Sequence, residues 1–219
     1  MGTGLSAAAL GAIWWLAVAP AGAAGVRRFL VDEVVAVVAA HSITLSEVRA
    51  EARIVLVQQH LSGAAWLDPD RGVLAATLQR MIDQRLVLGE LESLRTFELE
   101  RTEVESAMLR FRRKVGPPDR YEAFLRQIDM TDDEVGQALA RQIRYARYID
   151  SKVKLQGGLR KGDADEACAK DLGKVPTAGE LEACTHRLQL DRYRKVTEDV
   201  IAELRKRTDV RVLDPIEEK

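Results

Sequence analysis

The sequence predicts a mostly α-helical protein that carries one small β-sheet, built from short strands near its two ends. Apolar residues recur at helical spacing through most of the 219 residues, which is the main indication of amphipathic helices. Two segments, Thr44–Glu47 and Thr131–Glu134, place a hydroxyl three residues before a carboxylate, a pattern that caps helix starts. Runs of β-branched residues at Val34–Val38 and Val210–Leu213 favour strands. The predicted fold class is therefore a multi-helix domain whose sheet joins N-terminal and C-terminal strands.

The predicted elements follow one another with short connections. The strand Val34–Val38 turns over Ala39–Ser42 into a short return strand at Ile43. Helices are then expected over about residues 46–61, 70–94, 102–115, 121–128 and 131–153, and a last long helix from about residue 177 or 180 to 207. Gly116-Pro117-Pro118 ends the third helix, because glycine and proline both disfavour a helix interior.

The first two dozen residues differ in composition from the rest. Met1–Ala24 contain no charged side chain, and Leu10–Ala19 form an apolar run that includes two tryptophans. Pro20 ends the run, and Ala21-Gly22-Ala23 offers the small residues that signal peptidases accept. We interpret residues 1–23 as a cleaved secretory signal; the alternatives are an uncleaved anchor and a misassigned start codon. The run is shorter than the roughly 20 residues of a bilayer span, so stable membrane insertion is expected only if the signal is uncleaved.

Composition and charge exclude several classes of function. Lys and Arg total 33 and Asp and Glu 34, so no net positive field attracts nucleic acid or anionic lipid. Aromatic residues make up 5% of the chain, which leaves few surfaces on which bases stack. The sequence has no glycine-rich phosphate loop, no HExxH and no Gly-x-Ser-x-Gly. We expect no nucleic-acid partner, no cofactor, no metal and no catalytic residue.

The two cysteines of the chain are Cys168 and Cys184. In an oxidising compartment such a pair is read as one disulfide, which would contribute about 3 kcal/mol by closing a loop of roughly 15 residues. The alternative is two buried thiols. A zinc site needs more ligands, and His186 is the single histidine nearby.

Several stretches of the chain share motifs with one known family. Val31-Asp32-Glu33-Val34-Val35-Ala36-Val37-Val38, a turn and Ile43-Thr44-Leu45-Ser46-Glu47-Val48 follow the predicted signal. This arrangement resembles the opening of mature SurA-family periplasmic chaperones. Leu78–Leu88, Arg141-Gln142-Ile143-Arg144 and Ile201–Leu213 are similar to later helices and the closing strand of that family. The resemblance implies a SurA N-terminal-like helical domain over residues 31–155, which residues 180–213 complete with a C-terminal helix and strand.

The chain departs from that family between its fifth and last helices. SurA-like proteins carry parvulin prolyl-isomerase domains there, whereas this chain has residues 156–179, in which five glycines and Pro176 predict a linker with room for one helical turn around Cys168. Parvulin sites use paired histidines, but His41, His60 and His186 fall on different predicted elements. Residual isomerase activity is therefore not expected.

The resemblance implies an ATP-independent holdase in the periplasm that binds unfolded or partly folded clients, including outer-membrane or secreted proteins, through apolar helical surfaces. An alternative is a dedicated structural assembly factor for a single exported partner. For Met81, Met108 and Phe111 in the candidate client-binding set, the competing interpretation is an ordinary core residue. For Tyr145 and Tyr148 the alternative is RNA binding, which export and the neutral charge oppose. The set comprises Leu78, Met81, Leu86, Met108, Phe111, Phe124, Tyr145 and Tyr148. Arginines on the third to fifth helices, Arg141 and Arg144 among them, could form a charged rim around such a surface or an ordinary solvated face.

Overall fold

The computed structural model describes residues 32–94, 97–156, 161–173, 175–214 and 216. The predicted signal, residues 1–23, lies outside the described residues. Within the described part, no helix combines the length and the apolar character that crossing a bilayer requires.

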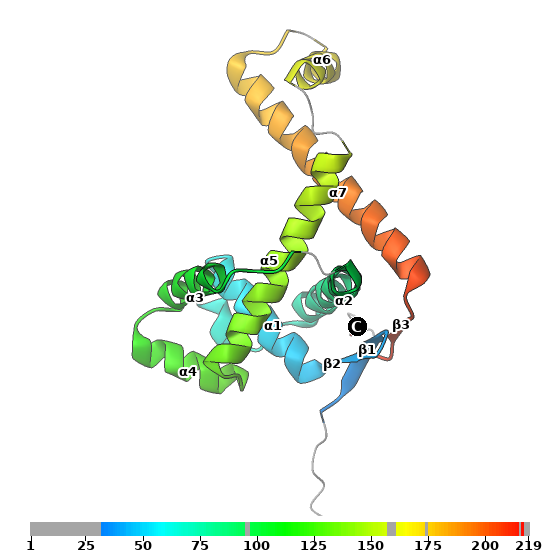
Figure 1. Ribbon diagram of the computed structural model, residues 1–219. Helices are drawn as coiled ribbons and strands as arrows, with labels where there is room; N and C mark the ends of the chain where they lie inside the picture. Colours follow the sequence, from blue (N-terminus) through cyan, green and yellow to red (C-terminus); the bar gives the residue numbers. More distant parts are fainter. Residues whose placement is uncertain (1–31, 95–96, 157–160, 174, 215, 217–219) are drawn as a thin grey trace, which may run out of the picture. The chain divides into compact units, whose positions relative to one another are not determined.

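The structure is mostly helical with a small sheet, which confirms the predicted fold class (Figure 1). The elements in chain order are β1 (Val34–Val38), β2 (His41–Thr44), α1 (Leu45–Gln58), the short 3-10 helix η1 (Ala64–Trp66), α2 (Arg71–Leu94), α3 (Arg101–Val115), α4 (Pro118–Ile128), α5 (Asp132–Leu155), α6 (Lys161–Leu172), α7 (Ala178–Arg207) and β3 (Val210–Val212). Most boundaries fall within a few residues of those that periodicity predicts.

The sheet brings the two ends of the described chain together. Its strand order is β2-β1-β3, with both pairings antiparallel. Val38 lies opposite His41 in the hairpin and opposite Val210 in the closing pair. The backbone N–H of Leu213 donates to the carbonyl of Val35 and extends this second ladder. The C-terminal strand therefore completes a sheet that the N-terminal strand begins, as the sequence predicts.

Capping boxes fix the start of three helices. The hydroxyls of Thr44, Thr131 and Thr177 each accept from the backbone N–H three residues later. The glutamate at that third position accepts in return from the backbone N–H of the threonine. These reciprocal bonds satisfy donors that a helix start leaves free.

Two apolar clusters form the core. The first contains the sheet, most of the apolar face of α2 and the C-terminal part of α7. The second gathers η1, α3, α4 and the N-terminal half of α5. Helices α1 and α5 contribute to both clusters, with Val48 and Ile149 in the first and Ile54 and Leu139 in the second. These two helices therefore connect the sheet-centred cluster to the α3–α4 cluster.

The interval between α5 and α7 is more ordered than the sequence predicts. The linker expected over residues 156–179 contains α6, a helix of 12 residues rather than one turn. Its sequence between Gly162 and Gly173 contains three alanines together with Glu166, Lys170 and Leu172, which favour helix. The glycines at both ends limit the helix without disrupting its interior, and this is why counting glycines gave the wrong prediction.

Candidate functional site

The predicted client-binding residues are core residues, and the structure corrects that prediction. Seven of the eight are buried in the two clusters: Leu78, Met81, Leu86, Met108, Phe111, Phe124 and Tyr148. The eighth, Tyr145, is half-buried, and burial raises its pKa to about 12. None of these side chains presents an open apolar surface to a client.

The broad apolar face of α2 is covered on several sides. Helices α1, α5 and α7 and strand β1 all pack against it. Phe124 is enclosed in the same way in the second cluster, with its ring 5.9 Å from the rings of both Trp66 and Phe111. A wide apolar helix face looks the same in the sequence whether neighbouring helices or a client cover it, so periodicity could not separate the two interpretations.

The predicted disulfide joins α6 to α7 and produces a helical hairpin. Cys168 and Cys184 are bonded, with their Cα atoms 5.9 Å apart. Both cysteines are buried, and Ala164 of α6 is buried beside them. Arg187 of α7 also pairs with Asp171 of α6. We call α6 together with residues 178–195 of α7 the α6–α7 hairpin.

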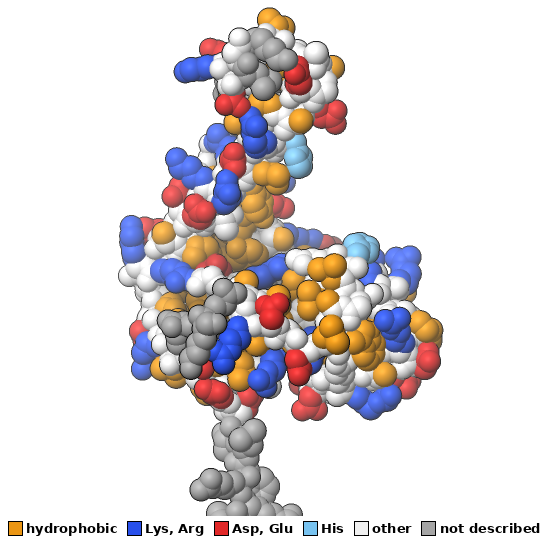
Figure 2. Space-filling model, turned by 180° about the vertical axis from the view of Figure 1, so that it is seen from behind, with side chains coloured by type: hydrophobic (Ala, Val, Ile, Leu, Met, Phe, Trp, Pro, Cys, Tyr) orange, Lys and Arg blue, Asp and Glu red, His pale blue; other side chains and the backbone are white. Residues whose placement is uncertain are grey.

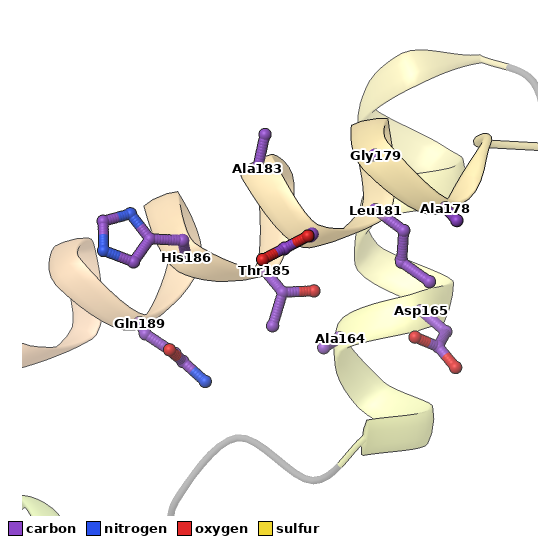
Figure 3. A pocket seen from close by; sticks show the side chains of 10 residues that line it. Ala164, Asp165, Ala178, Gly179, Leu181, Ala183, Thr185, His186 and Gln189 are labelled. Atoms are coloured by element: carbon purple, nitrogen blue, oxygen red, sulfur yellow. The ribbon is translucent and has the colours of Figure 1, made fainter.

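The α6–α7 hairpin contains an open hollow of about 890 Å³. Figure 3 shows Leu181 pointing from α7 towards α6, whose Ala164 and Asp165 line the facing wall. His186 and Gln189 extend the wall along α7. The remaining lining residues are Ala178, Gly179, Glu182, Ala183 and Thr185. Small and apolar side chains thus form much of the interior, and charged groups stand among them.

Exposed apolar side chains continue from the hollow along α7. Leu190 and Tyr193 follow His186 at spacings of four and seven residues, which places them on the same face of a helix. Leu190 is 56% exposed and Tyr193 36% exposed. Near them, the guanidinium of Arg192 donates to the backbone carbonyl of Gln156, 2.7 Å away, where α5 ends. Hydrophobic side chains lie between charged ones over this part of the molecule in Figure 2.

Most of the predicted arginine rim is divided between ion pairs and solvent. Arg112 pairs with Asp132, and Arg147 pairs with Glu103. The bond from Arg112 is the main reason why the pKa of Asp132 lies below its ordinary value. Arg141 and Arg144, by contrast, line a second depression of about 550 Å³ between α2, α5 and the C-terminal end of α7. We call this depression the α2–α5–α7 cleft.

The described residues bring no three His, Cys, Asp or Glu side chains into a metal-binding arrangement. The three histidines lie apart, with His41 on β2, His60 just after α1 and His186 on α7. The residues that sequence reasoning missed are Leu190 and Ala183, both exposed on α7. The sequence could have indicated them, because the apolar residues of the long helix α7 extend beyond the part that the short helix α6 can cover.

The chain was compared with family models, curated proteins and solved structures, and none of them matches it.

Proposed function

We propose that this chain is an ATP-independent holdase of the SurA type, which binds unfolded exported polypeptides and performs no covalent chemistry. The observation that carries the proposal is the open hollow of the α6–α7 hairpin together with the exposed apolar face that follows it on α7. Exposed apolar surface rimmed by charge is typical of sites that bind other polypeptides. The disulfide agrees with the oxidising periplasm, where such bonds persist.

The occupant that fits the hollow is an extended apolar segment flanked by basic residues. Leu181 and the alanines offer contacts for apolar side chains, while Asp165 and Glu182 add negative charge to the walls. Opposite charge guides association and restricts the choice of segment. Each leucine that such a segment buries contributes about 1.5 kcal/mol, or roughly a tenfold gain in affinity.

An aggregation assay tests the proposal. Wild-type protein in several-fold molar excess should suppress light scattering by a chemically unfolded protein unrelated to this chain. The variant Ala183→Glu/Leu190→Glu adds two charges to exposed positions of the α6–α7 hairpin, and it should lose most of the suppression. Circular dichroism and thermal melting show whether the variant still folds.

A matched control places the same charges elsewhere. Leu67 and Leu109 are 67% and 56% exposed and lie outside the α6–α7 hairpin, so Leu67→Glu/Leu109→Glu should suppress aggregation like the wild type. Equal loss in both variants would show that the hairpin is not the binding surface. No suppression by the wild type would refute the holdase proposal, and one stable complex with a single partner would then favour a dedicated assembly factor.

A further inference from the structure

Two guanidinium groups that form no direct ion pair with a described residue line the α2–α5–α7 cleft. Arg141 and Arg144 stand one turn apart on α5, both half-buried. Among the described residues, no carboxylate lies within 4.0 Å of either group and no acceptor forms a hydrogen bond with either. Arg85 of α2 joins them, and its carboxylate partner, Glu47, is 3.8 Å away. Positive charge therefore collects on the α5 side of the cleft.

The surroundings compensate only in part for the burial of the Arg141 guanidinium, through the carboxylates of Glu51 and Glu47. Burial lowers the pKa of Arg141, and it outweighs the opposing influence of Glu51; nearby Arg85 lowers the pKa further. The Nε of Arg144 is shielded from solvent, with no hydrogen-bond acceptor among the described residues. A donor buried without a partner destabilises the protein. An anion bound in the cleft would offset the burial of these positive charges.

The acidic side chains of the same cleft have neighbouring cations of their own or remain in solvent. Glu90 lies 3.9 Å from Arg207, and Asp209 lies 3.2 Å from Arg211. Glu92 is exposed. These groups stand on the C-terminal part of α2 and after α7, so they do not neutralise the two arginines of α5.

We infer that the α2–α5–α7 cleft binds a carboxylate of a polypeptide, seated on Arg141 and Arg144. The planar guanidinium matches a carboxylate with paired N–H donors, and arginines on consecutive turns of α5 can approach the same group. The inference rests on the proposed function in taking a polypeptide as the ligand.

Matched peptides test this site on the full chain by fluorescence anisotropy. A short apolar peptide with one glutamate and an amidated end is compared with the same peptide carrying glutamine, and with a glutamine peptide that keeps its free C-terminal carboxylate. The wild type should bind at least one carboxylate peptide about tenfold or more tightly than the neutral peptide. Whether the glutamate or the free end gives the gain identifies the source of the carboxylate.

Two double variants distinguish binding at the cleft arginines from a general effect of losing positive charge. Arg141→Gln/Arg144→Gln should remove the preference for the carboxylate, while Arg110→Gln/Arg113→Gln, which loses the same charge from exposed positions on α3, should retain it. Equal binding of all peptides by the wild type, or equal loss in both variants, would overturn the inference. Inorganic phosphate that competes at or below the peptide concentration would also overturn it, by revealing a general oxyanion site. If the wild type shows no preference for carboxylate peptides but still suppresses aggregation, the carboxylate site is refuted and the holdase proposal is retained.

Discussion

Removing the disulfide should release α6 without unfolding the core. In the variant Cys168→Ser/Cys184→Ser, Ala164 and the new serine at position 168 would be the buried side chains among those that the structure describes on α6. A helix of 12 residues is marginally stable in water without strong tertiary contacts. The two core clusters contain none of the α6 side chains that the structure describes, so the loss should remain local to the α6–α7 hairpin.

The size of the effect follows from the closed loop. A sequence separation of 16 residues gives about 3 kcal/mol of loop-closure entropy at 25 °C. If α6 opens independently of the core, its opening free energy falls by that amount. Amide hydrogen exchange in α6 should then accelerate by roughly 100-fold or more. The cooperative unfolding transition of the core should shift by less than about 1 kcal/mol, since its contacts are unchanged.

Hydrogen exchange followed by mass spectrometry measures both quantities. Peptides from α6 should exchange rapidly in the double serine variant, while those from α2 and β1 keep their protection. Wild-type protein treated with a reductant is the control and should behave like the variant. Unchanged exchange in α6, or loss of protection throughout the chain, would refute the reasoning that the disulfide holds α6 as a local unit.

Four further substitutions test individual features of the fold. Gly116 has φ 132°, and an added Cβ would lie 3.1 Å from Cδ of Arg120, so Gly116→Ala should lower the free energy of unfolding in urea by about 2 kcal/mol. The hydrogen bond from Arg112 lowers the pKa of Asp132, so the stability from this pair should be present above about pH 4 and lost as the pH falls through the lower folded pKa; Asp132→Asn should flatten that part of the pH profile of unfolding. Arg141→Met should leave the melting temperature unchanged or raise it, because it removes a half-buried charge without an ion-pair partner among the described residues, whereas Arg112→Met should cost about 0.5–1 kcal/mol.

The sequence predicted the framework well because its signals are local. The threonine–glutamate capping boxes at Thr44 and Thr131 specify where helices begin. The valine-rich runs specify β1 and β3, and the apolar periodicity specifies α2 and α5. The pairing of β3 with β1 joins strands that are far apart in the sequence, yet the β-branched composition of both strands indicated that they belong to one sheet.

The candidate site could not be predicted in the same way, because exposure depends on tertiary neighbours. Met81 and Leu190 are both apolar residues on helices, but Met81 is 5% exposed and Leu190 is 56% exposed. The difference comes from what covers each helix. Three helices and a strand pack on α2, whereas Leu190 stands on a part of α7 that leaves the core. Arg147 forms an ion pair with Glu103, whereas Arg141 forms none with a described residue, and this difference likewise depends on the positions of acidic groups on other helices.

The sheet also explains how this fold can place the proposed binding surface of the α6–α7 hairpin outside its core. Since β3 pairs with β1 and the C-terminal part of α7 packs on α2, the chain between α5 and α7 is an excursion from a structure that is already closed. Changes in that excursion do not disturb the two core clusters, which contain none of the α6 side chains that the structure describes. The hairpin can therefore expose apolar side chains without destabilising the core, while the arginines of α5 remain fixed on a helix that both clusters hold. Together the two proposals have an apolar segment and a carboxylate of the same client bind at two surfaces of opposite character.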